Sequence, residues 1–200
     1  RSMSNLIRKV GALGAGVMGS GIAAHCANAG IPTILLDIVP PSVGPKDDPK
    51  SKAFRNRFAL GGVDKLKKAK PAPIFNAKTV DLIEVGNFED DLAEAAKADM
   101  VIEVVKDDAD IKRNLFARLE PLVAEHTLVS SNTSGIAIAR MVEGRSQHFR
   151  KNFLGMHFFN PVRFMKLLEL VAGTDTDPAV VERWARFGED VLGKGVVYGK

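Results

Sequence analysis

The residues of this chain best suited to chemistry are an imidazole and a carboxylate near its C-terminal end. His157 precedes Glu169 by 12 residues in the segment GMHFFNPVRFMKLLE, where an Asn-Pro-Val turn separates two apolar runs. An antiparallel hairpin centred near Arg163 would place the two side chains opposite each other. A histidine so placed can accept a substrate proton while the carboxylate orients its ring. A merely hydrogen-bonded histidine on a strand is the commoner alternative, so the pair needs support from elsewhere in the chain.

A glycine-rich motif near the N-terminus provides the first support. The pattern GxGxxG is formed by Gly14, Ala15, Gly16, Val17, Met18 and Gly19. It lies between an apolar strand expected at 9–13 and a helix expected at 17–29, where its glycines would permit a tight turn, a close pyrophosphate and close helix packing. The helix N-terminus would stabilise the phosphate charge. The alternative is a glycine-rich helix start that serves packing alone.

An acid in the next strand extends the nucleotide interpretation. The apolar run TILLD, at 33–37, ends on Asp37, which follows Gly19 by 18 residues. A carboxylate there can accept hydrogen bonds from ribose hydroxyls and repels a 2′-phosphate, so the expected cofactor is NAD. Strand, helix and strand together predict a βαβ unit with a right-handed crossover.

Small polar side chains form a third motif, SSNTSG, at 130–135. The motif follows an apolar strand expected at 127–131, at the carboxyl edge where doubly wound folds bind ligands. Its hydroxyl and amide groups could donate to a substrate oxygen or a cofactor amide. On these residues alone, an ordinary turn and helix cap explains the segment equally well.

The remaining periodicity predicts a Rossmann-like, doubly wound α/β fold whose mostly parallel sheet has about eight strands and an antiparallel edge. A Pro- and Lys-rich segment at 39–52 is expected to be a flexible loop. Asp177 and Pro178 predict the start of a last helix that ends at Gly193. The other expected strands are 80–85, 100–105, 153–158, 166–171 and 196–198, and the other expected helices are 53–69, 89–97, 110–119 and 136–143.

Composition limits the possible classes of protein. The 200 residues, 46% apolar and 26% charged, are typical of one soluble domain. We expect a cytoplasmic protein with no membrane partner, because the chain has one cysteine, no signal-peptide pattern and no apolar run of about 18 residues. One cysteine and four scattered histidines predict no metal site. Residues 1–3 (Arg-Ser-Met) are interpreted as a cloning remnant.

Positive charge is concentrated between residues 46 and 70. Nucleic acid is one possible partner for such a stretch, but neither interleaved aromatic residues nor a known nucleic-acid-binding motif supports it. We therefore expect no nucleic-acid partner. A solvated helix face and a site for the phosphates of a small ligand are the other interpretations.

Taken together, GALGAGVMGSGIA, Asp37, SSNTSG and GMHFFNPVRFMKLLEL resemble the NAD-binding domain of L-3-hydroxyacyl-CoA dehydrogenases. The resemblance is to the bacterial fatty-acid β-oxidation type, which is often fused to an enoyl-CoA hydratase domain. It extends over residues 7–200 and is weakest over 40–75. It implies that His157 is the catalytic histidine, that Glu169 is its partner, and that Ser134 contacts both substrate and nicotinamide.

The resemblance also implies further binding residues. Asn160 would lie on the cofactor side, and Lys112 near the nicotinamide-side pyrophosphate or ribose. Asp107 takes the place of the family's glutamate and is one methylene shorter. The family's CoA-contacting basic helix corresponds loosely to residues 63–70, where Lys68 and Lys70 are the best candidates.

The function implied by the resemblance is NAD-dependent oxidation of L-3-hydroxyacyl-CoA to 3-oxoacyl-CoA. The family continues into a helical domain that completes the acyl pocket and the dimer contact and that residues 1–200 do not include. We therefore expect residues 1–200 to be inactive alone, and we expect the protein with its helical domain to form a homodimer. Three alternatives stay open: a non-catalytic NAD-binding module, a β-hydroxyacid dehydrogenase of the 6-phosphogluconate type and a crystallin-like structural protein. The second uses a catalytic lysine from its helical domain, which the His157/Glu169 pair does not resemble.

Overall fold

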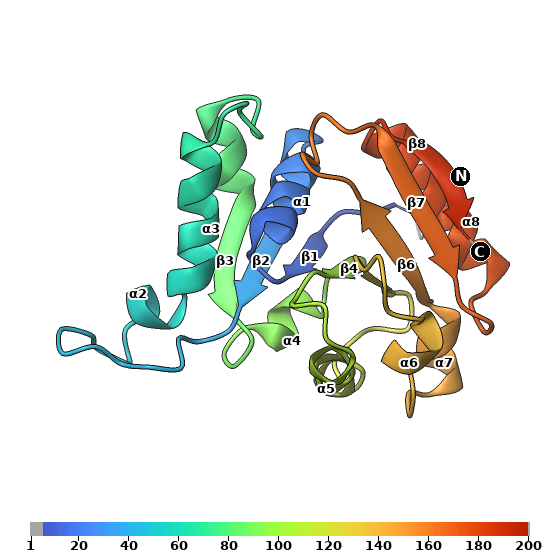
Figure 1. Cartoon of the computed structure of the whole chain (residues 1–200), viewed down its shortest axis with the longest axis horizontal. Helices are drawn as coiled ribbons and strands as arrows, with labels where there is room; N and C mark the ends of the chain where they lie inside the picture. The colour runs from blue at the N-terminus through green and yellow to red at the C-terminus, as the bar shows by residue number, and fades with distance from the viewer. Residues whose placement is uncertain (1–5, 200) are drawn as a thin grey trace.

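One eight-stranded sheet, ordered β3-β2-β1-β4-β5-β6-β7-β8, organises the chain (Figure 1). The structure is a computed structural model that describes residues 6–199, so the interpretation of residues 1–3 lies outside the described residues. All neighbouring strands pair in parallel except β6 and β7, which are antiparallel. The predicted fold class is therefore confirmed. The strands are β1 Val10–Leu13, β2 Thr33–Asp37, β3 Ile83–Asn87, β4 Met100–Glu103, β5 Leu128–Ser131, β6 Phe153–Phe158, β7 Leu167–Ala172 and β8 Gly195–Gly199.

Helices cover both faces of the sheet. Helices α1, α3 and α8 pack on one face and α4 to α7 on the other, where Figure 1 shows them along the lower side of the view. The helices are α1 Val17–Asn28, α2 Lys52–Arg55, α3 Arg57–Lys68, α4 Leu92–Ala95, α5 Ala109–Leu119, α6 Ile138–Met141, α7 Gln147–Lys151 and α8 Pro178–Arg186; a 3₁₀ helix η2 spans Ala77–Leu82 and a π-helical turn η3 spans Phe187–Val191.

The central strands are buried on both faces, which is why they read as unbroken apolar runs. Successive side chains of β4 alternate between the two layers. Met100 and Ile102 pack with Ile22 of α1, whereas Val101 packs on the opposite face with Phe116 of α5. This double burial fixes the register of the strands whose ends carry the motifs.

Two predicted elements are wrong in their boundaries because side-chain hydrogen bonds, one long-range and one local, override the propensity of the segment. The helix predicted at 53–69 is divided into α2 and α3 at Asn56, whose Oδ1 accepts a hydrogen bond of 2.7 Å from Nδ2 of Asn87. The strand predicted at 80–85 begins only at Ile83, because Asn76 caps η2 by accepting from the Thr79 amide.

Other boundaries also differ from prediction. Helix α4 has 4 residues instead of the range 89–97, and α6 covers 4 residues of the range 136–143. Strand β4 ends at Glu103 instead of 105, and α8 gives way to η3 at Phe187. Helix α7 was not predicted; it begins where Ser146 Oγ accepts from the Phe149 amide.

The segment predicted as a flexible loop is irregular from 39 to 51, and Figure 1 shows it projecting away from the sheet. An ion pair between Asp47 and Arg57 links this segment to α3. The mobility of this segment stays a prediction.

The motifs meet at the carboxyl ends of the parallel strands. The glycine motif follows β1, Asp37 ends β2, and SSNTSG spans the end of β5. The strand order reverses between β1 and β4, which is the topological switch point where such sheets bind ligands. The fold therefore brings the three motifs to one edge.

Candidate dinucleotide and catalytic site

The glycine loop after β1 has three distinct geometries. Gly14 has φ +118°, and a Cβ there would lie 2.5 Å from the carbonyl oxygen of Val104. A Cβ on Gly19 would overlap the carbonyl oxygen of Gly14, whereas a Cβ on Gly16 would meet nothing within 4 Å. The first glycine permits the turn, the third permits α1 to pack closely, and the second faces open space. This geometry fits a pyrophosphate above the N-terminus of α1.

Asp37 joins the end of β2 to the glycine loop. Its Oδ2 accepts from the Ala15 amide at 2.8 Å, and its Oδ1 accepts from the Ile38 amide at 2.7 Å. Each carboxylate oxygen keeps a further lone pair for a ribose hydroxyl. A cavity of about 570 Å³ adjoins this carboxylate and is lined by Ile38 and Ile111, two apolar residues that the sequence did not single out. Its size and mixed lining fit an adenosine.

The imidazole and carboxylate predicted to pair do so across the β6–β7 hairpin. His157 lies directly opposite Glu169 in the register, and its Nδ1 lies 3.2 Å from Oε2 of Glu169. The side chains are 20% and 36% exposed respectively, so both are partly sheltered but reachable. The ring of Phe159 lies 4.5 Å from the imidazole, centroid to centroid. The predicted hairpin geometry is thus present.

Asn132 links the small polar motif to the histidine strand. Its Oδ1 accepts from the Phe158 amide at 2.8 Å, and its own amide donates to the carbonyl of Glu103 at 2.8 Å. The ends of β4, β5 and β6 are therefore tied together. Ser134, two residues further on, is exposed at the same edge of the sheet.

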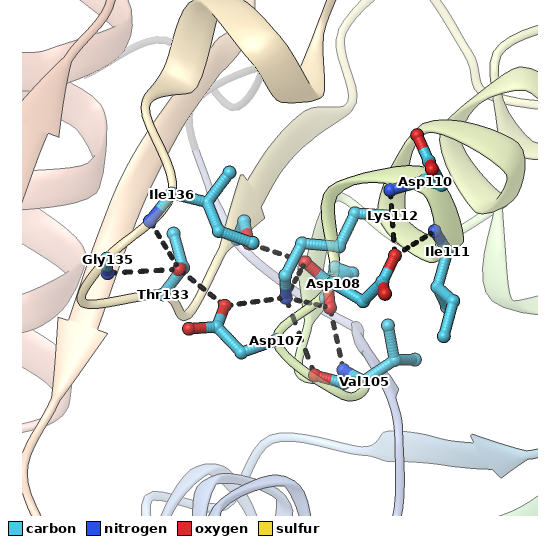
Figure 2. Close-up of polar contacts among 11 residues, drawn as sticks. Val105, Asp107, Asp108, Asp110, Ile111, Lys112, Thr133, Gly135 and Ile136 are labelled. Carbon is cyan, nitrogen blue, oxygen red and sulfur yellow. Dashed lines mark hydrogen bonds and ion pairs between the residues drawn. The ribbon is translucent and has the colours of Figure 1, made fainter.

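Lys112 lies in a buried ion pair. Its side chain is 0% exposed, and its Nζ lies 2.8 and 3.0 Å from the two carboxylate oxygens of Glu103. Nζ also donates to the carbonyl of Val105 at 3.4 Å and lies 3.7 Å from Oδ1 of Asp107, as Figure 2 shows. The ammonium is thus enclosed in an ion pair within the protein, and a direct cofactor contact by Lys112 stays a prediction. The side chain of Asp107, at 51% exposure, is open to a ligand.

Glu103 is a buried acid that the sequence interpretation missed, although a carboxylate inside the apolar run MVIEVV was the available signal. Its side chain is 0% exposed, and burial raises its pKa while Lys112 and Ser131 oppose that rise. Ser131 Oγ donates to one carboxylate oxygen, and the Val105 amide donates to the other at 2.6 Å. Such bonds offset the cost of removing two charges from water.

A second cavity, of about 250 Å³, lies between α1, α3 and the turn after β6. Asn160 and Lys70, both predicted site residues, line it together with Lys65. Lys68 is exposed at the end of α3 and is not among the lining residues. Lys65 could have been found from helical periodicity, because positions 62, 65, 66 and 69 share one face.

Two cations hold the turn that carries Asn160. Arg163 Nη1 donates to the carbonyl of Ala72 at 2.6 Å, which ties the turn to the segment after α3. Lys194 is 6% exposed and donates to the carbonyls of Met165, at 2.7 Å, and Val162. Desolvation lowers the pKa of Lys194. These hydrogen bonds fix the turn that forms one wall of the cavity.

Within residues 6–199, three or more His, Cys, Asp or Glu side chains nowhere gather as a metal site would require. No helix in this described range has the length and apolar character needed to cross a bilayer.

Comparison with known proteins gives the same picture. Residues 9–200 match the family described as 3-hydroxyacyl-CoA dehydrogenase, NAD binding domain. A probable 3-hydroxyacyl-CoA dehydrogenase of Bacillus subtilis is 47% identical over 99% of this chain and 26% of its own length. A protein of the same description from Deinococcus radiodurans is 45% identical over 96% of this chain and 53% of its own length.

Solved structures agree. The crystal structure of (S)-3-hydroxybutyryl-CoA dehydrogenase from Ralstonia eutropha superposes with a TM-score of 0.74 at 29% identity, covering 96% of this chain and 63% of that one. This chain thus spans about a quarter to a half of the curated relatives named above. Family match, fold and site geometry coincide, and the chain belongs to the NAD-binding domain family of the 3-hydroxyacyl-CoA dehydrogenases.

Proposed function

We propose that this chain is the cofactor-binding domain of an enzyme that oxidises L-3-hydroxyacyl-CoA to 3-oxoacyl-CoA with NAD⁺ in fatty-acid β-oxidation. The observation that carries the proposal is the His157–Glu169 pair, with 3.2 Å between Nδ1 and Oε2, on the strand that Asn132 ties to the SSNTSG segment. A merely structural histidine would not need a carboxylate partner at the ligand-binding edge of the sheet.

The pair supplies a general base. With Nδ1–H donating to Glu169, the lone pair on Nε2 of His157 takes the proton of the substrate 3-hydroxyl. Glu169 then stabilises the imidazolium and keeps the ring in one orientation. NAD⁺, when bound, supplies the acceptor for the hydride that leaves C3. Ser134, exposed at the same edge, positions the reacting oxygen.

The cavity beside Asn160 provides a site for the CoA part of the substrate. Lys65 and Lys70 line it, and their ammonium groups suit the phosphates of CoA. Lys68 would contribute only at longer range from the exposed end of α3. This assignment favours the small-ligand interpretation of the basic stretch over a nucleic-acid site.

The greater length of the relatives supports a further helical domain in the intact protein, through which we propose a homodimer forms. The proposal also places the protein in the cytoplasm. Cys26 is fully buried, which raises the pKa of its thiol to about 12, and a reducing compartment suits such a lone cysteine.

Turnover of stereochemically defined substrates tests the proposed function. The intact protein should form NADH from L-3-hydroxybutyryl-CoA and NAD⁺, and the D-enantiomer should give at most a trace. The rival, a non-catalytic module, predicts NADH binding by fluorescence titration with no turnover of either enantiomer. That outcome in the intact protein would overturn the proposal and leave the binding module in its place.

A further inference from the structure

The hydroxyl group of Thr133 connects two loops at the ligand-binding edge. Its Oγ1 donates to Oδ1 of Asp107 at 2.7 Å, which joins the loop after β5 to the loop after β4. The same oxygen accepts from the amides of Gly135 at 3.4 Å and Ile136 at 3.3 Å. Figure 2 shows Thr133 between Asp107 on one side and these two amides on the other. One hydroxyl therefore bridges a carboxylate and the backbone that follows Ser134.

The acid at the other end of this bridge is itself anchored. Asp107 Oδ1 lies 3.7 Å from Nζ of Lys112, which is held by both carboxylate oxygens of Glu103. Glu103 in turn accepts from Ser131 Oγ. The contacts thus run from Ser131 through two buried charges to Asp107 and back to Thr133. The first and last residues of the segment 131–133 are therefore both linked to the loop after β4 or to the end of β4 itself.

Ser134 follows directly after three residues whose side chains are all engaged. Ser131 bonds Glu103, Asn132 accepts from the Phe158 amide, and Thr133 bonds Asp107. Ser134 is exposed, so the position of its hydroxyl depends on the backbone at both sides. Thr133 restrains the backbone after Ser134, because its Oγ1 accepts from the amides of Gly135 and Ile136.

We propose that Thr133 is a positioning residue that couples Asp107, on the cofactor side, to Ser134, on the substrate side. The proposal rests on the proposed function for its catalytic consequence. A ribose hydroxyl that donates to the exposed Asp107 carboxylate would restrain it, and the Thr133 bond would pass that restraint to the Ser134 backbone. Cofactor binding would then order the group that receives the substrate.

Isosteric substitution isolates the hydroxyl. Thr133→Val keeps the branched shape and removes the donor to Asp107 and the acceptor for the two amides, whereas Thr133→Ser keeps both. Thr127→Val is the matched control: Thr127 is 2% exposed at the opposite end of β5, where its Oγ1 donates to the carbonyl of Ala98 at 3.0 Å. A hydrogen bond to a charged group is among the stronger ones, so we expect kcat to fall about tenfold in Thr133→Val.

Turnover by the intact protein gives the first result. Thr133→Ser should restore kcat to within about twofold, and Thr127→Val should keep it even though it loses a buried hydrogen bond. Asp107→Ala combined with Thr133→Val should be no slower than Asp107→Ala alone, because each single change removes the hydrogen bond between Thr133 and Asp107. Unchanged kcat in Thr133→Val, no rescue by serine, or additive losses would overturn the proposal.

Hydrogen exchange gives a second result that does not depend on turnover. In the wild-type protein, saturating NADH should slow amide exchange at Gly135 and Ile136, and in Thr133→Val that slowing should disappear. Wild-type protein in which NADH leaves these amides unaffected would refute the coupling. If the slowing is present but no L-3-hydroxyacyl-CoA is oxidised, the coupling stands and the proposed function fails.

Discussion

Removing the positive partner of the buried ion pair should destabilise the protein strongly. Lys112 and Glu103 are both 0% exposed, and their charged groups lie 2.8 Å apart. Lys112→Met keeps most of the side-chain volume but leaves the Glu103 carboxylate buried without its counter-charge. Breaking such a pair typically costs about 3–5 kcal/mol of unfolding free energy. For a domain of this size, that corresponds to a fall in Tm of roughly 6–20 °C.

The loss should depend on pH in a defined direction. Burial already raises the pKa of Glu103, and removing Lys112 takes away the main charge that opposes this rise. When the pKa of an acid is higher in the folded than in the unfolded state, the free energy of unfolding falls as the pH rises and the acid loses its proton. The free energy of unfolding of Lys112→Met should therefore be least reduced by Glu103 at and below pH 4.5, the ordinary pKa of a glutamate, and should fall as the pH rises above it. The slope should reach at most about 1.4 kcal/mol per pH unit.

Urea denaturation followed by the fluorescence of the buried Trp184 measures both effects at pH 5 and pH 8. Lys112→Met/Glu103→Gln, which removes both charges, should recover most of the loss and abolish its pH dependence. Lys97→Met is the control, because Lys97 pairs with Glu94 on the surface at 71% exposure and should cost little. A Lys112→Met variant as stable as this control at pH 8 would refute the reasoning.

Three further predictions concern the nucleotide site, the cavity beside α3 and a surface ion pair. Asp37→Asn should raise the Kd for NADH about tenfold and reduce the preference of the protein for NADH over NADPH, because the carboxylate no longer accepts from the ribose or repels a 2′-phosphate. Fluorescence titration with both nucleotides measures the two Kd values. Lys65→Ala and Lys70→Ala should each raise the KM for acetoacetyl-CoA more than Lys68→Ala does, and equal effects of all three would contradict the cavity assignment. Arg55 donates to both carboxylate oxygens of Asp90, at 2.6 and 2.7 Å, and lowers the pKa of Asp90 to about 2. The stability that wild type holds over Asp90→Asn should therefore be present above pH 3.8 and lost towards about pH 2 in acid titrations. If the stability difference between wild type and Asp90→Asn stays constant between pH 3.8 and about pH 2, the ion pair of Asp90 is not its source.

Local pattern was sufficient to predict the parts of the site that depend on neighbouring residues. The Pro-containing turn between two apolar runs set the β6–β7 register, and so placed His157 opposite Glu169. The order of strand, GxGxxG, helix, strand and Asp37 predicted the loop geometry for the same reason. Each of these features is decided within about 30 residues, where periodicity and turn chemistry dominate.

Features that depend on distant contacts could not be read from the sequence. The division of α2 from α3 depends on Asn87, which lies 31 residues from Asn56, at the end of β3. Lys112 could be matched to a family position, but its complete burial beside Glu103 follows from the packing of α5 against β4. Burial of this kind emerges only when the sheet assembles.

The proposed function depends on His157, held by Glu169, acting as the general base. Its most direct test is kcat for oxidation of L-3-hydroxybutyryl-CoA by the intact His157→Gln protein, measured beside its Kd for NADH. We expect kcat to fall by a factor of about 10²–10⁴ while the affinity for NADH stays close to that of wild type. Turnover within a few-fold of wild type would contradict this role of His157.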